Sequence, residues 1–181
     1  MGKARLEEVY RTTVRPSLQK SLGIANIMAV PLITKIVINV GIKEAVADSK
    51  AVQKVQHVLN RIAGQSSVKT RAKKSIAGFK IREGMSIGAR VTLRKEQMYV
   101  FLDKLVNLAL PKVRDFQGVP TKFDRQGNYN LGINDWTIFP EADMLASDNA
   151  HGLNITICTT AKTDAHGFEL LKQFGMPFRK A

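Results

Sequence analysis

The residues best suited to chemistry in this sequence form a cluster of cations between positions 69 and 95, and that chemistry would be the binding of a polyanion. The cations are Lys69, Arg71, Lys73, Lys74, Lys80, Arg82, Arg90, Arg94 and Lys95. Nine cations stand against one acid, Glu83, so the segment carries a formal charge of +8, and the whole chain of 181 residues carries +13. Each phosphate that a Lys or Arg neutralises releases condensed counterions, which favours nucleic acid as the partner.

Glycines and apolar residues within the same segment favour RNA binding over a merely solvated charged face. Gly78, Gly84 and Gly88 allow the backbone to approach a phosphate closely, and Ile76 and Phe79 could pack on sugars and bases. A solvated face would mix charges of both signs to limit self-repulsion. An anionic membrane surface is the alternative partner, but the sequence has no run of 18 apolar residues and no prominent basic amphipathic helix. We therefore predict a nucleic-acid partner and no membrane.

Side chains that could support catalysis or hold a metal ion are scattered along the sequence. His57, His151 and His166 lie far apart, with no Cys, Asp or Glu at ligand spacing. Cys158 is the single cysteine and lies in a predicted strand, where a small buried thiol is the ordinary interpretation. Phosphate-loop, dinucleotide-binding and nucleophile-elbow motifs do not occur. We predict a cytoplasmic protein that is not an enzyme and has no cofactor; an RNA-modifying or RNA-processing enzyme is the alternative.

Strands on either side must position the basic segment. Alternation of apolar and polar residues predicts one strand over residues 33–41 and another over residues 88–94. Ile36, Ile38 and Val40 would face inward from the first of them. The outward residues of the two strands would be Lys35, Asn39, Arg90, Thr92 and Arg94. These side chains would form one polar face of a sheet, and the loop between the strands would be the part of the chain least able to order itself.

Helices are predicted where apolar residues recur every three to four positions. Pro16 breaks or restarts the first helix. The second helix begins with a cap at Asp48 and ends at Gly64. Leu108 lies on the apolar side of a third helix, and Asp164 caps the last one. Further strands are predicted over residues 66–72, 127–133, 135–141 and 153–161.

The order of these elements indicates the fold class. Helices and strands occur in blocks rather than in strict alternation. We therefore predict an α+β fold with a largely antiparallel sheet, helices packed on one face of it, and a long basic loop. The chain would form a single domain over residues 1–181, with the basic loop at residues 72–88 as an extended insertion.

Six sequence blocks, in this order, resemble the bacterial form of the fifth large-subunit ribosomal protein family, the 5S rRNA-binding proteins. They are VPLITKIVINVG (30–41), RAKKSIAGFKIREGMSIGARVTLR (71–94), LPKVRDFQGV (110–119), FDRQGNYNLGI (123–133), IFPE (138–141) and GLNITICTTAKTD (152–164). The likeness extends from about residue 5 to residue 180.

The resemblance implies a structural protein of the central protuberance of the large ribosomal subunit. It implies that Asn39, Gln65 and Thr92 bind 5S rRNA, and Arg90 and Arg94 are expected to assist them. It further implies that the loop over residues 72–88 contacts P-site tRNA. The expected contact residues of this loop are Lys73, Lys74, Ser75, Phe79, Lys80 and Arg82. Other partners implied are 23S rRNA, neighbouring large-subunit proteins, and a small-subunit head protein at an intersubunit bridge.

Overall fold

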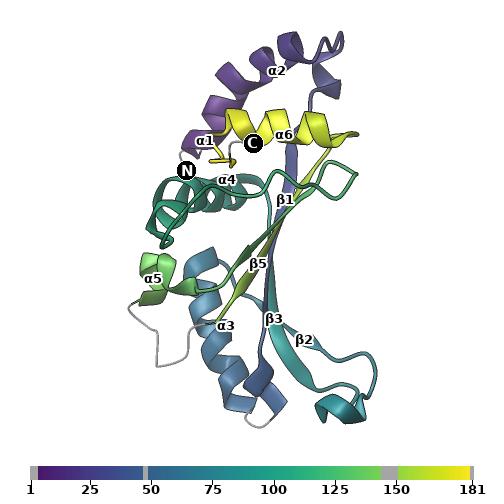
Figure 1. Ribbon diagram of the computed structural model, residues 1–181, viewed down its shortest axis with the longest axis vertical. Coiled ribbons are helices and arrows are strands. Elements are labelled where there is room, and N and C mark those ends of the chain that lie inside the picture. The colour runs from purple at the N-terminus through teal and green to yellow at the C-terminus, as the bar shows by residue number, and fades with distance from the viewer. Residues whose placement is uncertain (1–3, 47–48, 144–150, 180–181) are drawn as a thin grey trace. The chain divides into compact units, whose positions relative to one another are not determined.

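Figure 1 shows the computed structural model, which describes residues 4–46, 49–143 and 151–179. Its five strands form one antiparallel sheet in the order β2-β3-β1-β5-β4, with helices packed around it. The strands are β1 (Ile33–Gly41), β2 (Val68–Arg71), β3 (Ser86–Leu93), β4 (Tyr129–Ile133) and β5 (Leu153–Thr159). The predicted α+β fold class is therefore confirmed.

The chain divides into two compact units, and β1, β3, β4 and β5 contribute residues to both. The first unit comprises Met1–Ile36, Leu93–Leu131 and Thr156–Ala181. The second comprises Val37–Thr92 and Gly132–Ile155.

Three helical segments of the first unit surround an apolar and aromatic core (Figure 1). They are α1 (Arg5–Val9) with α2 (Arg15–Ser21), α4 (Lys95–Lys104), and α6 (Asp164–Gln173). The ring of Tyr10 stacks on that of Phe174 with centroids 5.9 Å apart, and its hydroxyl donates a hydrogen bond to the carbonyl oxygen of Pro31 (2.9 Å). Burial of this phenol raises its pKa above the ordinary value.

The first helix restarts near Pro16, as the sequence predicts. A π-helical turn, Tyr10–Val14, separates α1 from α2, and Pro16 lies in the first turn of α2. An amide is not required at that position for the hydrogen bonds of α2, so proline is tolerated there.

Two sequence predictions for this unit are wrong. The N-cap of α6 is Thr163, whose side chain accepts a hydrogen bond from the amide of His166 (3.5 Å). Asp164 instead accepts from the amides of Arg125 (3.2 Å) and Gly127 (3.1 Å), so its carboxylate closes a distant turn. Leu108 was expected on the apolar stripe of its helix but is 50% exposed, because a π-helical turn, Leu105–Ala109, follows α4 and rotates the register.

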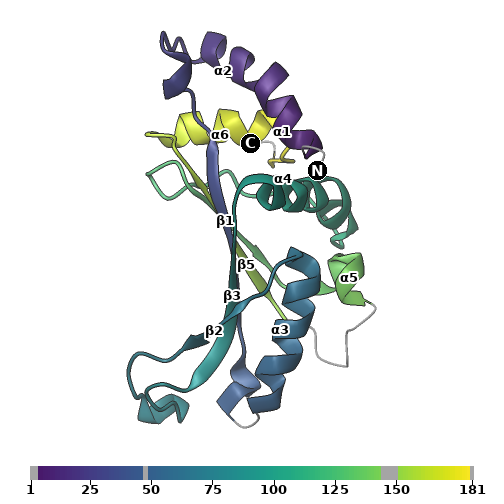
Figure 2. The ribbon, with the colours of Figure 1, turned by 180° about the vertical axis from the view of Figure 1, so that it is seen from behind.

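The second unit packs α3 (Ser49–Ala63) along the sheet (Figures 1 and 2). The apolar residues that recur every three to four positions along α3 are buried: Val52, Val55, Leu59 and Ile62. Side chains of α3 also bind the segment before β2, since Gln56 donates to the carbonyl oxygen of Ser67 (2.6 Å) and Asn60 accepts from the Ser67 amide (2.7 Å). Gly64 follows α3 with φ of +65°, the left-handed conformation that ends many helices. The proposed cap Asp48 lies outside the described residues.

The strand predicted over residues 135–141 is wrong. A 3₁₀ turn, Trp136–Ile138, and the short helix α5 (Pro140–Asp143) occupy this segment. Asp135 caps the turn by accepting a hydrogen bond from the amide of Thr137 (2.8 Å), and Pro140 has the fixed φ that suits the first position of a helix.

Strands β2 and β3 form an antiparallel hairpin in which Val68 lies opposite Arg90 and Thr70 opposite Gly88. The register shifts between Thr70 and Arg71. Gly88 is closely packed: a Cβ atom at this position would lie 2.9 Å from Oγ1 of Thr70 and nearer still to the carbonyl oxygen of Val40. The absence of a side chain at Gly88 therefore allows β1, β2 and β3 to approach one another here.

Candidate nucleic-acid interface

The alternation of β1 and β3 gives the second unit one polar sheet face. Ile38, Val40 and Val91 are buried, whereas Asn39 and Thr92 are half-buried and Arg90 is exposed. Side chains alternate between the two faces of a strand, so the polar residues project away from the apolar ones on the same strands. The predicted outward orientation of Asn39, Arg90 and Thr92 is confirmed.

A hydrogen bond holds Gln65 beside β3. The side-chain amide of Gln65 donates to the backbone carbonyl oxygen of Thr92, and the two atoms are 3.3 Å apart. The left-handed turn at Gly64 directs the chain out of α3, and Gln65 is exposed immediately after it. Four of the five predicted 5S rRNA residues therefore belong to one compact unit.

Arg94, the fifth predicted residue, belongs to the other compact unit. It is exposed and has an extended backbone (φ −139°, ψ 165°) at the position that precedes α4. Its outward direction, which follows the alternation of β3, agrees with the prediction.

The basic loop is shorter than predicted, because β3 begins at Ser86 and includes the last three residues of the expected range. All six predicted contact residues in the loop are exposed: Lys73, Lys74, Ser75, Phe79, Lys80 and Arg82. The Ser75 hydroxyl oxygen accepts a hydrogen bond from the amide of Glu83 (3.0 Å), so Ser75 also braces the loop. That internal role was not predicted, since it depends on a contact between residues eight positions apart.

The remaining candidate side chains form no common site. Cys158 is half-buried on β5, and the ring of His151 meets that of Trp136 edge-on at 4.9 Å. Within residues 4–46, 49–143 and 151–179, no three His, Cys, Asp or Glu residues group together in a way that could hold a metal ion. No helix over those same ranges is long and apolar enough to span a bilayer.

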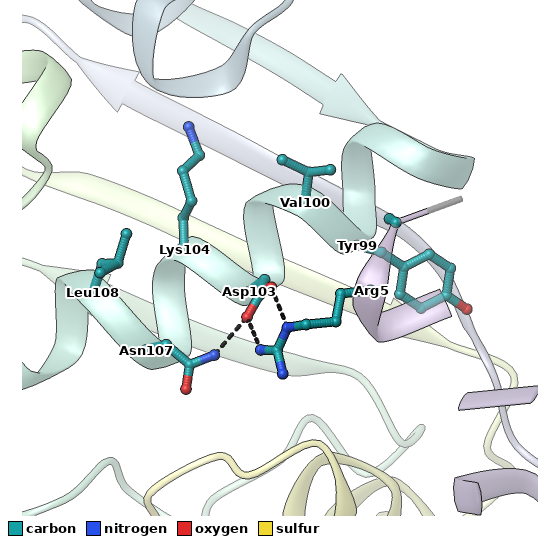
Figure 3. A pocket seen from close by; sticks show the side chains of 8 residues that line it. Arg5, Tyr99, Val100, Asp103, Lys104, Asn107 and Leu108 are labelled. Carbon is teal, nitrogen blue, oxygen red and sulfur yellow. Dashed lines mark hydrogen bonds and ion pairs between the residues drawn. The ribbon is translucent and has the colours of Figure 1, made fainter. Parts of the chain in front are cut away.

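A hollow of about 350 Å³ lies in the first unit, beside α1 and α4, and contains none of the predicted interface residues (Figure 3). Its polar part is a network around Asp103: Nε of Arg5 donates to the carboxylate at 3.1 Å, and Asn107 donates to it from the π-helical turn. The hydrogen bond from Arg5 lowers the pKa of Asp103 below its ordinary value. Burial raises the pKa of Tyr99, at the edge of the hollow, to about 12.

Comparison with protein families agrees with the sequence resemblance. One family model, described as ribosomal protein L5, matches residues 26–82, and a second, which describes the C-terminal part of the same ribosomal family, matches residues 86–178. The chain belongs to the ribosomal protein L5 family. Most of both compact units lies within the two matched ranges.

Bacterial relatives named large ribosomal subunit protein uL5 match nearly the whole chain. The protein of Acidobacterium capsulatum is 56% identical over 178 residues, which are 98% of each chain. The protein of Syntrophotalea carbinolica is 53% identical over 98% of this chain and 97% of its own length. That of Nitratidesulfovibrio vulgaris is 55% identical over 97% of this chain and 99% of its own length.

Membership of this family determines the general role. The L5 proteins are structural constituents of the ribosome and not enzymes, so the chain is a ribosomal, RNA-associated protein of translation. The enzyme alternative is thereby excluded, and the predicted cytoplasmic location agrees with that of bacterial ribosomal proteins.

Proposed function

We propose that this L5 protein binds 5S rRNA in the central protuberance of the large subunit through the polar face of β1 and β3. The observation that carries the proposal is the convergence of Asn39, Gln65, Arg90 and Thr92 in one compact unit, with Gln65 bonded to Thr92. Neutral hydrogen-bonding groups held by strands can meet RNA in a fixed geometry, and Arg90 supplies charge for phosphates. The name of the relatives supports a place in the large subunit.

We further propose that the basic loop contacts P-site tRNA. Its exposed cations give it charge for an RNA backbone, and it lies at the end of the β2–β3 hairpin, where it projects from the second unit (Figures 1 and 2). The family resemblance also supports contacts with 23S rRNA, neighbouring large-subunit proteins, and a small-subunit head protein at an intersubunit bridge.

Binding of 5S rRNA at fixed salt tests the first proposal. Thr92→Val removes the hydroxyl but leaves the backbone carbonyl that accepts from Gln65, so it changes one RNA-facing group with little change of structure. We expect Thr92→Val and Asn39→Ala each to weaken binding by about 1–3 kcal/mol, since each leaves a buried RNA partner unpaired.

The control is the free energy of unfolding, which we expect to change little in both variants because neither side chain is fully buried. A duplex RNA of equal length should bind all three proteins equally. Unchanged affinity for 5S rRNA in both variants would show that this face is not the binding surface.

A further inference from the structure

The basic loop has more internal order than its sequence indicates. Main-chain hydrogen bonds join Ala72 to Met85 (2.8 Å) and Gly84 to Ala72 (3.0 Å), and Ile76 and Ile81 exchange two more at 2.9 and 3.1 Å. Together with the Ser75–Glu83 bond, these contacts continue the hairpin beyond β2 and β3. The loop therefore has a defined geometry before any partner binds.

A 3₁₀ turn, Ala77–Phe79, forms the end of this hairpin (Figure 1). Lys80 then adopts the left-handed conformation (φ 54°, ψ 30°), which reverses the chain toward Ile81. The ring of Phe79 is 69% exposed and the side chain of Ile76 is 47% exposed. A turn selected only for solubility would carry polar residues at such positions, so this exposed aromatic ring indicates a binding surface.

The charges around Phe79 indicate the class of partner. Lys73, Lys74, Lys80 and Arg82 are exposed in the same loop, and Glu83 is the only acid between positions 69 and 95. A partner protein would require many acids to match these cations, whereas RNA presents phosphates beside the flat faces of bases. An exposed aromatic ring flanked by cations matches both features of RNA.

We propose that Phe79 is a stacking platform for an exposed nucleobase of a folded RNA. The cations hold the phosphates, and the ring covers a base face that is not stacked within the RNA itself. Because the hydrogen bonds fix the backbone of the turn in advance, little backbone conformational entropy is lost on binding. The inference rests on the proposed function of the loop, and it assigns the contact to a base as well as to the tRNA backbone.

Photo-crosslinking in assembled ribosomes identifies the partner. The variant Phe79→p-benzoylphenylalanine is incorporated into the full chain, P-site tRNA is bound, and the ribosomes are irradiated. A crosslink to a tRNA nucleotide supports both the inference and the proposed function. A crosslink to a ribosomal RNA nucleotide supports stacking on RNA but overturns the tRNA proposal, and a crosslink to protein alone, or none, overturns the inference.

Substitution at the same position separates stacking from general apolar contact. We expect Phe79→Ala and Phe79→Leu each to raise the dissociation rate of P-site tRNA about fivefold or more, and Phe79→Trp to stay within about twofold, because only an aromatic ring stacks on a base. The effect of Phe79→Leu should persist at high salt, whereas that of Lys80→Gln should shrink. Wild-type dissociation rates for Phe79→Leu would overturn the inference.

Ser75→Ala tests whether the loop is fixed in advance. It removes the bond to the amide of Glu83, and faster hydrogen exchange of that amide in the free protein distinguishes a loss of loop order from the loss of an RNA contact by Ser75. We expect the dissociation rate of P-site tRNA to rise about twofold or more, since the loop must then be ordered on binding. The affinity for 5S rRNA should remain unchanged in all these variants. A parallel loss of that affinity would overturn the assignment of the loop to a contact separate from 5S rRNA binding.

Discussion

The side-chain amide of Gln65 and the backbone carbonyl of Thr92 are joined by a hydrogen bond of 3.3 Å. This bond connects the segment that leaves α3 to β3, so two residues that lie 27 positions apart are held side by side. The carbonyl acceptor belongs to the backbone, and the Thr92 hydroxyl remains a separate group on the polar face of β3. Gln65 is thus bonded to β3, and its contact with 5S rRNA is a prediction.

We predict that Gln65→Ala weakens 5S rRNA binding by about 1 kcal/mol, because a hydrogen-bonding group is lost from the proposed surface. Gln65→Glu should weaken binding further, since a carboxylate cannot donate to the Thr92 carbonyl and repels phosphate. Fluorescence titration of labelled 5S rRNA measures both effects. The matched control is Gln53→Ala, on the exposed side of α3, and an equal loss in that variant would contradict the prediction.

The sequence predicts this surface in part. Strict alternation in residues 33–41 and 88–94 determines which side chains of β1 and β3 are buried, because burial of one face of a sheet requires a period of two. That pattern identified Asn39, Arg90 and Thr92 as outward residues. The position of Gln65 depends on where α3 ends relative to β3, and no local sequence pattern predicts that. Only the family resemblance indicates Gln65 as a 5S rRNA-binding residue.

Residues 135–143 and the basic loop show why other predictions failed. Apolar residues in Asp-Trp-Thr-Ile-Phe-Pro-Glu are as compatible with a strand as with short turns, and the Asp135 cap and Pro140 favour the turns. Three glycines in the basic segment indicate a loop that is the part of the chain least able to order itself. Long-range bonds such as Ala72–Met85 and Ser75–Glu83 order it instead, and these have no sequence signature.

Gly88→Ala should destabilise the chain by about 1–3 kcal/mol, because the new methyl group would press on Thr70 and Val40 and displace strands. Urea denaturation measures the change. The control is Gly78→Ala, since a Cβ atom at Gly78 would meet nothing within 4 Å. Equal stability of the two variants would mean that β1, β2 and β3 can separate at Gly88 without cost.

Asp103 should make the stability of the chain depend on pH in the acid range. The hydrogen bond from Arg5 lowers the pKa of this carboxyl in the folded state, so the unfolded state takes up a proton first as the pH falls. The stabilisation is complete above the unfolded pKa and is lost as the pH drops through the folded pKa, below about pH 4.

Asp103→Asn should therefore lower the free energy of unfolding at pH 7 by about 0.2–1 kcal/mol, as expected for an ion pair near the surface, with an exposed arginine and a half-buried carboxylate. The difference between the variant and the parent protein should vanish at low pH. Urea denaturation at pH 7 and at pH 3 measures it, and a difference that is the same at both values would show that Asp103 acts through packing and not through its charge.

Arg90 and Arg94 should each contribute to the salt dependence of 5S rRNA binding. If about five phosphates are neutralised, the logarithm of the binding constant should fall with the logarithm of salt concentration at a slope of roughly −3 to −5. Arg90→Gln and Arg94→Gln should each reduce the magnitude of that slope by about 1, because each removes one phosphate contact.

Lys54→Gln, a change of equal charge at an exposed position on α3, should leave the slope unchanged. The slopes are measured by titration between 50 and 300 mM salt, roughly the range over which counterion release is resolved. Equal changes in all three variants would show that net charge alone, and not a contact at Arg90 or Arg94, governs binding.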